Sequence, residues 1–266
     1  MAGLTGKSIA SAYKSLLRVD DDTNGIDTTV ADITDGEGTK SALGLCDDVV
    51  QIQPQNDDNT IALFVRSKGG TPLLAVDTTN SIVKAGVGQF NALTQYAYFS
   101  VHTATTSANT AGYHYPLNFG HGPTTGIADQ LNIFGNGTDP ATTVTTADAN
   151  DQRASSIVNF LMYVPDNISV DSVVSLEGAD AATGDTTRFH LMSYTFNSGS
   201  TSALADGTLI AHNSDTTNAG SEQIYKSTWT IDSASVSAGK VLVCTFESDS
   251  VNSDYSCNVV VKYHLV

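Results

Sequence analysis

Short β-type runs separated by turn signals fill residues 44–86, and they limit what this part of the chain can fold into. The runs cover residues 48–52, 59–66, 73–76 and 81–84, with Lys68-Gly69-Gly70 and Asp77-Thr78-Thr79-Asn80 between them. Four strands of about five residues bury little apolar surface by themselves. In a symmetric oligomer the missing neighbour is another copy of the same module. The pattern therefore predicts an assembly protein rather than an enzyme.

Beyond Phe90 the runs become longer and are separated by polar loops. Alternation is clearest at the end, where Tyr255, Cys257, Val259, Val261, Tyr263 and Leu265 would face one core. Ten strands are predicted, at residues 95–104, 112–118, 130–134, 156–164, 169–176, 188–196, 207–212, 223–231, 240–247 and 256–265. Strands with no helix between them predict an all-β fold, here an antiparallel β-sandwich of jelly-roll type.

One helix is predicted, at residues 5–19, because apolar residues recur there at helical spacing. Ile9, Tyr13, Leu16 and Leu17 follow an i, i+4, i+7, i+8 pattern. A single helix of about four turns is marginal in isolation, so its apolar stripe must dock on its own body or on another protein. We favour docking on another protein, which makes these four residues candidate anchoring residues.

Three regions follow. We expect a helix and connector for attachment at residues 1–43, a small β-hairpin module for oligomerisation at 44–92, and an outward-facing β-sandwich at 93–266.

The charge balance argues against nucleic acid as a partner. The chain has 12 basic and 28 acidic residues, a net charge of −16, whereas phosphate binding relies on clustered Lys and Arg. No apolar run approaches the roughly 20 residues that cross a bilayer. The N-terminus lacks the layout of a secretory signal, so we expect a protein made in a cytosol, without a membrane span.

The metal-binding and cysteine signals are weak. Residues 20–25 match the first half of a calcium loop, but Ala31 stands where a bidentate Glu is needed, so an acidic connector is the better interpretation. Cys244 and Cys257 can face each other across a hairpin, and we expect reduced core thiols rather than a bridge. We predict no metal and no cofactor.

One stretch, residues 112–122, stands out by its aromatic and glycine content. Tyr113, His114, Tyr115 and His121 lie in it, and aromatic faces with flanking polar groups suit a saccharide or a protein partner. Its two histidines, with no nearby Cys or carboxylate, are a weak metal signal. The alternative is a buried aromatic crossover inside the sandwich.

No catalytic motif is present. The sequence has no nucleophile elbow, phosphate loop, dinucleotide fingerprint or His-Glu-x-x-His. Glycoside cleavage needs two carboxylates held roughly 5–10 Å apart, and the many Asp residues lie mostly in polar loops. We name no catalytic residue and expect no enzyme.

Over its first third the chain resembles the short fibre, spike or decoration proteins of tailed bacteriophages. The resemblance rests on the opening segment 6–19 with the turn Asp35-Gly36-Glu37-Gly38-Thr39, on Ser41-Ala42-Leu43-Gly44-Leu45 running into the strand at 48–52, and on the hairpin 73–84. Over the sandwich the resemblance is limited to composition, namely Thr/Ser/Asn-rich loops and few charged residues.

The resemblance implies a non-enzymatic component of the virion, commonly a homotrimer. Its N-terminal end would face the other virion proteins, and its sandwich would point outward to a host surface glycan. Head fibre, tail fibre and capsid decoration all remain open. Two alternatives also remain, namely a polysaccharide-degrading spike and a free-standing glycan-binding module.

Overall fold

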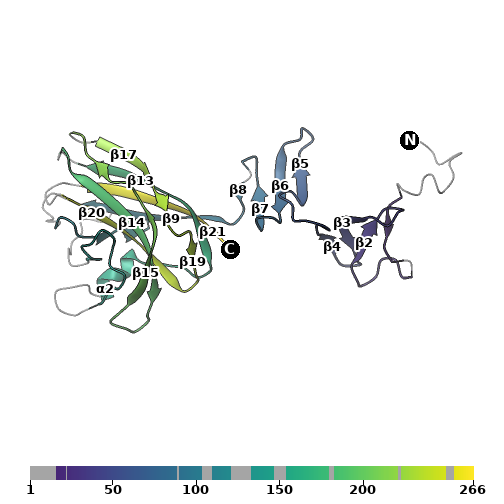
Figure 1. Ribbon diagram of the computed structural model, residues 1–266, viewed down its shortest axis with the longest axis horizontal. Coiled ribbons are helices and arrows are strands. Elements are labelled where there is room, and N and C mark those ends of the chain that lie inside the picture. The colour runs from purple at the N-terminus through teal and green to yellow at the C-terminus, as the bar shows by residue number, and fades with distance from the viewer. Residues whose placement is uncertain are drawn as a thin grey trace. The chain divides into compact units, whose positions relative to one another are not determined.

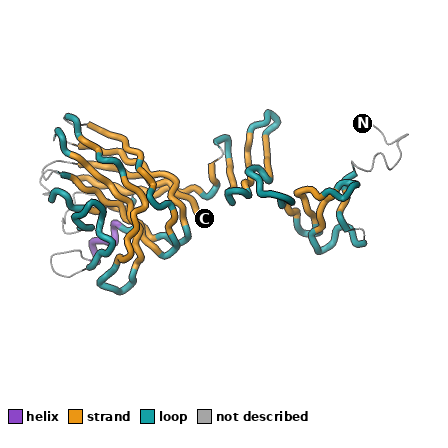
Figure 2. Tube along the Cα trace, viewed as in Figure 1, coloured by secondary structure: helices purple, strands orange, loops and turns teal. Residues whose placement is uncertain are grey.

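The computed structural model describes residues 16–21, 23–88, 90–103, 110–120, 133–146, 154–179, 183–220, 223–249 and 255–266. Strands dominate it, and all their pairings are antiparallel (Figure 2). The described helices are the single turns α2 (Ala154–Ile157) and η2 (Val158–Phe160). The fold is therefore all-β, and two compact units, 1–93 and 94–266, divide the chain.

Unit 1 contains two separate four-stranded sheets, each following the order of the chain. The first consists of β1 (Arg18–Val19), β2 (Ala31–Thr34), β3 (Lys40–Leu45) and β4 (Val50–Ile52). The second consists of β5 (Leu63–Arg66), β6 (Pro72–Asp77), β7 (Ile82–Ala85) and β8 (Phe90–Asn91). Both are meanders, which Figure 1 shows in purple and blue.

Unit 1 has almost no apolar core. Among its described residues only Ile33 and Ala75 are buried apolar side chains. The buried carboxylate of Asp77 instead pairs with Lys84 Nζ at 2.7 Å. Hydrogen bonds from Lys84 and Asn80 hold the pKa of Asp77 at about 2.

The prediction of a helix at residues 5–19 is wrong where the structure describes that segment. Leu16 and Leu17 have no regular structure and are exposed, and Arg18 and Val19 form β1 against Thr34 and Ile33. Pairing with β2 satisfies the backbone groups of Arg18 and Val19, whereas an isolated helix end would leave carbonyls without partners. Ile9 and Tyr13, and with them the rest of the predicted helix, lie outside the described residues.

Unit 2 is built from two antiparallel sheets (Figure 1). The six-stranded sheet has the order β11-β9-β21-β13-β17, with β19 pairing β13. Its strands are β9 (Thr94–Thr103), β11 (Asn118–Phe119), β13 (Ile168–Ala179), β17 (Gln223–Thr228), β19 (Ser235–Val236) and β21 (Tyr255–Leu265).

The seven-stranded sheet has the order β10-β20-β14-β15-β18, with β12 pairing β20 and β16 pairing β14. Its strands are β10 (Tyr115–Pro116), β12 (Met162–Tyr163), β14 (Thr186–Phe196), β15 (Leu204–His212), β16 (Thr216–Thr217), β18 (Thr230–Ile231) and β20 (Lys240–Ser248).

The inner faces of these two sheets share the main core. Phe99, Val259 and Val261 from the six-stranded sheet belong to one buried cluster with Phe189 and Phe246 from the seven-stranded sheet. The alternation predicted for β21 is confirmed at Cys257, Val259 and Val261, which are buried, while Ser256 and Asn258 are exposed. Cys244 and Cys257 are both buried free thiols.

Most of the long strand predictions in unit 2 are confirmed to within a few residues, but the one at 156–164 is wrong. That segment forms α2, η2 and the short β12. Ile157 and Phe160, three residues apart, bury together with Ala203, a spacing that one helical turn brings to one side. Within the predicted strand at 112–118 the structure has only β10 and the first residue of β11, and most of the one at 130–134 lies outside the described residues.

A second, smaller core lies on the outer side of the seven-stranded sheet. Phe134 and Val144, from the segment before α2, pack there with Met192, Tyr194 and Leu204. Tyr194 donates a hydrogen bond to the carbonyl of Ala141 at 2.9 Å. The segment 133–146 therefore covers this part of the sheet.

Gly207 in β15 lets the segment 133–146 lie close to the sheet, and a larger residue at this position should destabilise the fold. A Cβ at Gly207 would lie 2.7 Å from Cε1 of Tyr194 and 2.9 Å from Cα of Thr142. We expect Gly207→Ala to lower the free energy of unfolding by about 1–3 kcal/mol, because overpacking must displace the backbone. Urea unfolding measures this, with Gly178→Ala as the control, since its Cβ would meet Ser256 at an ordinary 3.7 Å. Equal effects of the two substitutions would contradict the prediction.

Candidate functional site

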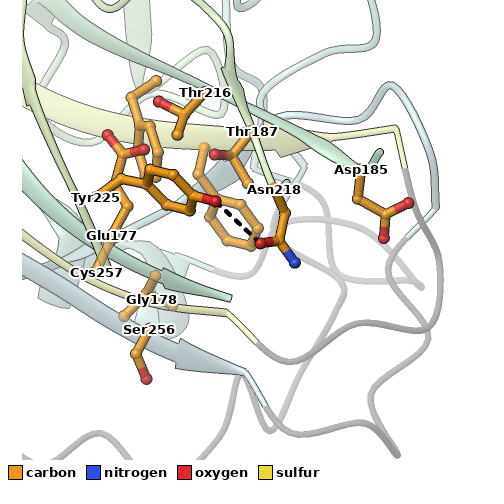
Figure 3. A pocket seen from close by; sticks show the side chains of 12 residues that line it. Glu177, Gly178, Asp185, Thr187, Thr216, Asn218, Tyr225, Ser256 and Cys257 are labelled. Atoms are coloured by element: carbon orange, nitrogen blue, oxygen red, sulfur yellow. Dashed lines mark hydrogen bonds between the residues drawn. The ribbon is translucent and has the colours of Figure 1, made fainter. Parts of the chain in front are cut away.

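A pocket opens at one end of unit 2, between the two sheets (Figure 3). Val101, Phe189, Phe246 and Cys257 form its apolar wall. Its polar lining comes from Glu177, Asp185, Thr187, Thr216, Asn218, Tyr225 and Ser256. The cavity volume that water can enter is about 10 Å³. That is the space of about one water molecule, so no sugar ring fits inside.

Glu177 is the chemically distinctive group of this pocket. It lies on β13 opposite Cys257 of β21, and its carboxylate is almost fully buried. Ser175 Oγ donates to Glu177 Oε1 at 2.5 Å and accepts from Trp229 Nε1 at 2.8 Å. Oε2 of Glu177 has no hydrogen-bond partner within the described chain.

The neighbouring thiols are not activated nucleophiles. Burial raises the pKa of Cys257, and the negative charge of Glu177 raises it further. Burial likewise raises the pKa of Cys244, with Cys257 adding to the effect. A thiol held in its protonated form is a poor nucleophile and a poor metal ligand. Within the parts of the chain that the structure describes, no three His, Cys, Asp or Glu residues are grouped to hold a metal ion.

The pocket mouth is closed on one side by Tyr225. Its hydroxyl lies 3.2 Å from Asn218 Oδ1 (Figure 3) and closer still to Gln223 Oε1, and it accepts a hydrogen bond from the backbone N–H of Ala219 at 2.9 Å. Thr216 Oγ1 and Ser227 Oγ are 3.0 Å apart on the same side. These contacts tie β16 of one sheet to β17 of the other, which is a structural role.

A second polar cluster, the histidine pair His114 and His190, lies on the seven-stranded sheet. The two rings meet edge to face with centroids 5.0 Å apart, and both side chains are buried. His114 Nε2 donates to the carbonyl of Gly137 at 2.8 Å, which leaves Nδ1 as the unprotonated nitrogen of a neutral ring. Nδ1 of His114 and Nδ1 of His190 both lack hydrogen-bond partners in the described structure.

Burial keeps this pair neutral. Desolvation lowers the pKa of His114, and it lowers the pKa of His190 to about 3, with the charges of His114 and Arg188 acting in the same direction. Asp139 Oδ1 lies 3.5 Å from His190 Nε2 but is itself well exposed. The pair therefore behaves as a buried, uncharged contact at neutral pH.

An ion-pair network flanks the histidine pair. Arg188 binds Asp215 through Nε at 2.7 Å and Nη2 at 2.8 Å, and its Nη1 lies 3.6 Å from Glu247. These hydrogen bonds raise the pKa of Arg188 and lower the pKa of Asp215. Because Asp215 accepts two hydrogen bonds from the guanidinium of Arg188, this side chain is already paired and is not available to bind a ligand.

The residues predicted as a ligand site are only partly surface groups. His114 and Tyr115 are buried, with Tyr115 packed on Phe246 at 5.7 Å between ring centroids. The alternative interpretation, a buried aromatic crossover, describes these two residues. Tyr113 is half-buried against the main core, and His121 lies outside the described residues. A ligand site at Tyr113 and His121 stays a prediction.

Sequence reasoning missed His190, Arg188 and Asp139 as partners of His114. His190 stands between Phe189 and Leu191 in an apolar run, so nothing local marks it. The pairing of β14 with β20 and of β10 with β20 brings these residues together. No sequence signal could have found this cluster without the strand register.

Comparison with known proteins does not assign the chain to a family. No protein-family model matches the chain, and no curated protein matches it. A structural match is to the Eiger TNF from S. frugiperda, at 11% sequence identity and a TM-score of 0.29, covering 65% of this chain and 93% of that one. At that level of likeness nothing about this chain follows from it. No helix in the described residues is long and apolar enough to cross a membrane.

Proposed function

We propose that this chain is a non-enzymatic structural protein of a tailed-phage particle. It is a short fibre or appendage of the tail or head, present as a homotrimer, which exposes its sandwich for adhesion to a host surface glycan. The observation that carries the proposal is the near absence of a core in unit 1. Two buried apolar side chains among its described residues are too few to offset the entropy of ordering so many residues. Unit 1 therefore needs a partner to be stable.

The architecture of unit 2 supports an outward position for it. Among the longer strands, the chain crosses between the sheets from β13 to β14, β15 to β17, β17 to β20 and β20 to β21, and the first and last of them, β9 and β21, lie side by side. We interpret this path as a jelly roll. Its cross-sheet core is complete within one chain, so unit 2 can project without support.

The partners follow from the same division. Unit 1 would contact the other virion proteins through residues 1–43, with Ile9, Tyr13, Leu16 and Leu17 as the anchoring candidates. Leu16 and Leu17 are exposed in the single chain, which suits such a contact. The net charge of −16 argues against nucleic acid as a partner.

Labelling of intact particles tests the proposal. Antibodies raised against unit 2 should bind whole tailed particles from cells that make this protein, and the protein should co-sediment with them. A chain found only in the soluble fraction would overturn the assignment to the virion. Retention on a glycan array separates an adhesive role from a purely structural one, and release of sugars from capsule polysaccharide would favour a degrading spike.

A further inference from the structure

The described chain satisfies only one of the two oxygens of the buried carboxylate of Glu177. The side chain of Glu177 is 4% exposed. Its Oε1 accepts the hydrogen bond from Ser175 Oγ, while Oε2 has no hydrogen-bond partner among the described residues. No ion pair within the described residues includes Glu177. Because buried charges in proteins are normally paired or bound to a metal ion, we expect a partner from outside the described chain at Oε2.

The cavity of the pocket lies beside this carboxylate (Figure 3). Glu177 lines it together with the oxygen-bearing side chains of Thr187, Thr216, Asn218 and Tyr225, all of them uncharged. Glu177 lies opposite Tyr225 of β17, and Thr187 lies opposite Thr216 of β16, so both sheets contribute to the lining. The volume of about 10 Å³ holds one guest of the size of a water molecule.

The charge of the lining indicates the valence of a bound ion. Asp185 is the other carboxylate of the pocket, and Figure 3 shows it apart from Glu177, on the other side of the mouth. Divalent ions such as Ca²⁺ take many oxygen ligands, and their sites usually contain several carboxylates. A single carboxylate among uncharged oxygens instead balances one positive charge.

We propose that the cavity beside Glu177 is a binding site for one monovalent cation of about the size of a water molecule, Na⁺ or K⁺. Oε2 of Glu177 supplies the negative charge, and the uncharged oxygens of the lining supply the other ligands. The ion connects β13 and β17 of one sheet with β14 and β16 of the other at this end of unit 2. The site lies within one chain, so it does not depend on the proposed function.

Two alternatives make a different prediction. Glu177 with a proton on Oε2 is neutral and offers no charge to a cation. A water molecule fills the same volume without any dependence on salt. In both cases no saturable binding of Na⁺ or K⁺ is expected.

Trp229 reports occupancy of the site. Its indole N–H donates to Ser175 Oγ, which donates in turn to Glu177 Oε1, so a cation at Glu177 should change its fluorescence. We expect titration of the full chain with NaCl or KCl at neutral pH to give a saturable change. Tetramethylammonium chloride keeps the ionic strength constant, because its cation is too large for the cavity. The midpoints of the two titrations distinguish Na⁺ from K⁺.

Glu177→Gln is the decisive variant, because it keeps the size of the side chain and an oxygen for the hydroxyl of Ser175 but removes the charge. We expect it to weaken cation binding at least 10-fold. Glu247→Gln is the matched control, since Glu247 lies 3.6 Å from Arg188 and outside this pocket, and it should leave the midpoint within about twofold. Equal titrations of the unaltered chain and Glu177→Gln, or no saturable change in the unaltered chain, would overturn the proposal.

Thermal unfolding of the unaltered chain keeps the test valid if Glu177→Gln misfolds. A ligand that binds only the folded state raises the unfolding temperature. We therefore expect unit 2 to unfold several degrees higher in NaCl or KCl than in tetramethylammonium chloride at the same concentration. The same unfolding temperature in all three salts would contradict the proposal, and the assignment to the virion would still stand or fall by the antibody experiment.

Discussion

Phe246→Ala is expected to lower the free energy of unfolding of unit 2 by about 3–5 kcal/mol. Phe246 is almost fully buried and lies between Tyr115 and Phe189, with ring centroids 5.7 and 6.4 Å away. Removing a buried ring loses its transfer free energy and leaves a cavity that the two sheets cannot close. A loss of this size is a large fraction of the 5–15 kcal/mol that typically stabilises a domain.

Trp229, the only tryptophan of the chain, reports this unfolding directly. It is buried in the same core, and its ring lies 5.9 Å from that of Phe189. Urea unfolding of the full chain, followed by its fluorescence, gives the change in free energy. Phe196→Ala is the matched control, because Phe196 on β14 is exposed, and should cost less than about 1 kcal/mol. A similar loss for both variants would mean that the core does not lie where the structure has it.

Acid should destabilise unit 2 well before its carboxylates protonate. The folded chain holds the pKa of His190 at about 3, against 6.5 for an unperturbed histidine, and the pKa of His114 is lowered as well. Between these values the unfolded chain binds more protons than the folded one, so stability is lost as the pH falls from 6.5 toward 3. One pKa unit corresponds to about 1.4 kcal/mol, so the difference between 6.5 and about 3 makes the total loss from His190 on the order of 5 kcal/mol.

Two non-titrating replacements isolate this effect. His190→Phe and His190→Gln differ in packing and polarity, but both should flatten the dependence of the free energy of unfolding on pH between 6.5 and 4.5. Asp139, Asp215, Glu247 and Arg188 also face the pair, and His212 adjoins His190 across the strands. The carboxylate of Asp215 titrates below this window because Arg188 lowers its pKa. An unchanged slope in both variants would show that other groups cause the acid effect.

The strands of unit 2 could be predicted because their signals are local. Apolar and polar residues alternate through residues 255–265, and the structure has β21 there. Residues 156–164 misled the prediction because a short apolar run has no clear period, and only the burial of Ile157 and Phe160 beside Ala203 selects a helical turn. The spacing of Leu16 and Leu17 likewise predicted a helix, but the next two residues, Arg18 and Val19, pair with β2 instead.

The two polar clusters, around Glu177 and around the histidine pair, could not be predicted from the sequence for a different reason. His114 and His190 are 76 positions apart in number, and their contact depends on the register of three strands. Glu177 meets Cys257 only because β13 pairs with β21. The apolar runs of unit 1, in contrast, are short and local, so the sequence alone was enough to predict that the module needs a neighbour.

The mass of the purified full-length chain in solution, measured by light scattering over a range of concentrations, tests the central claim most directly. We predict a mass about three times that of the 27.8 kDa chain, stable on dilution because unit 1, with two buried apolar side chains among its described residues, needs a partner. A mass of one chain at every concentration would contradict the account of unit 1 as an assembly module.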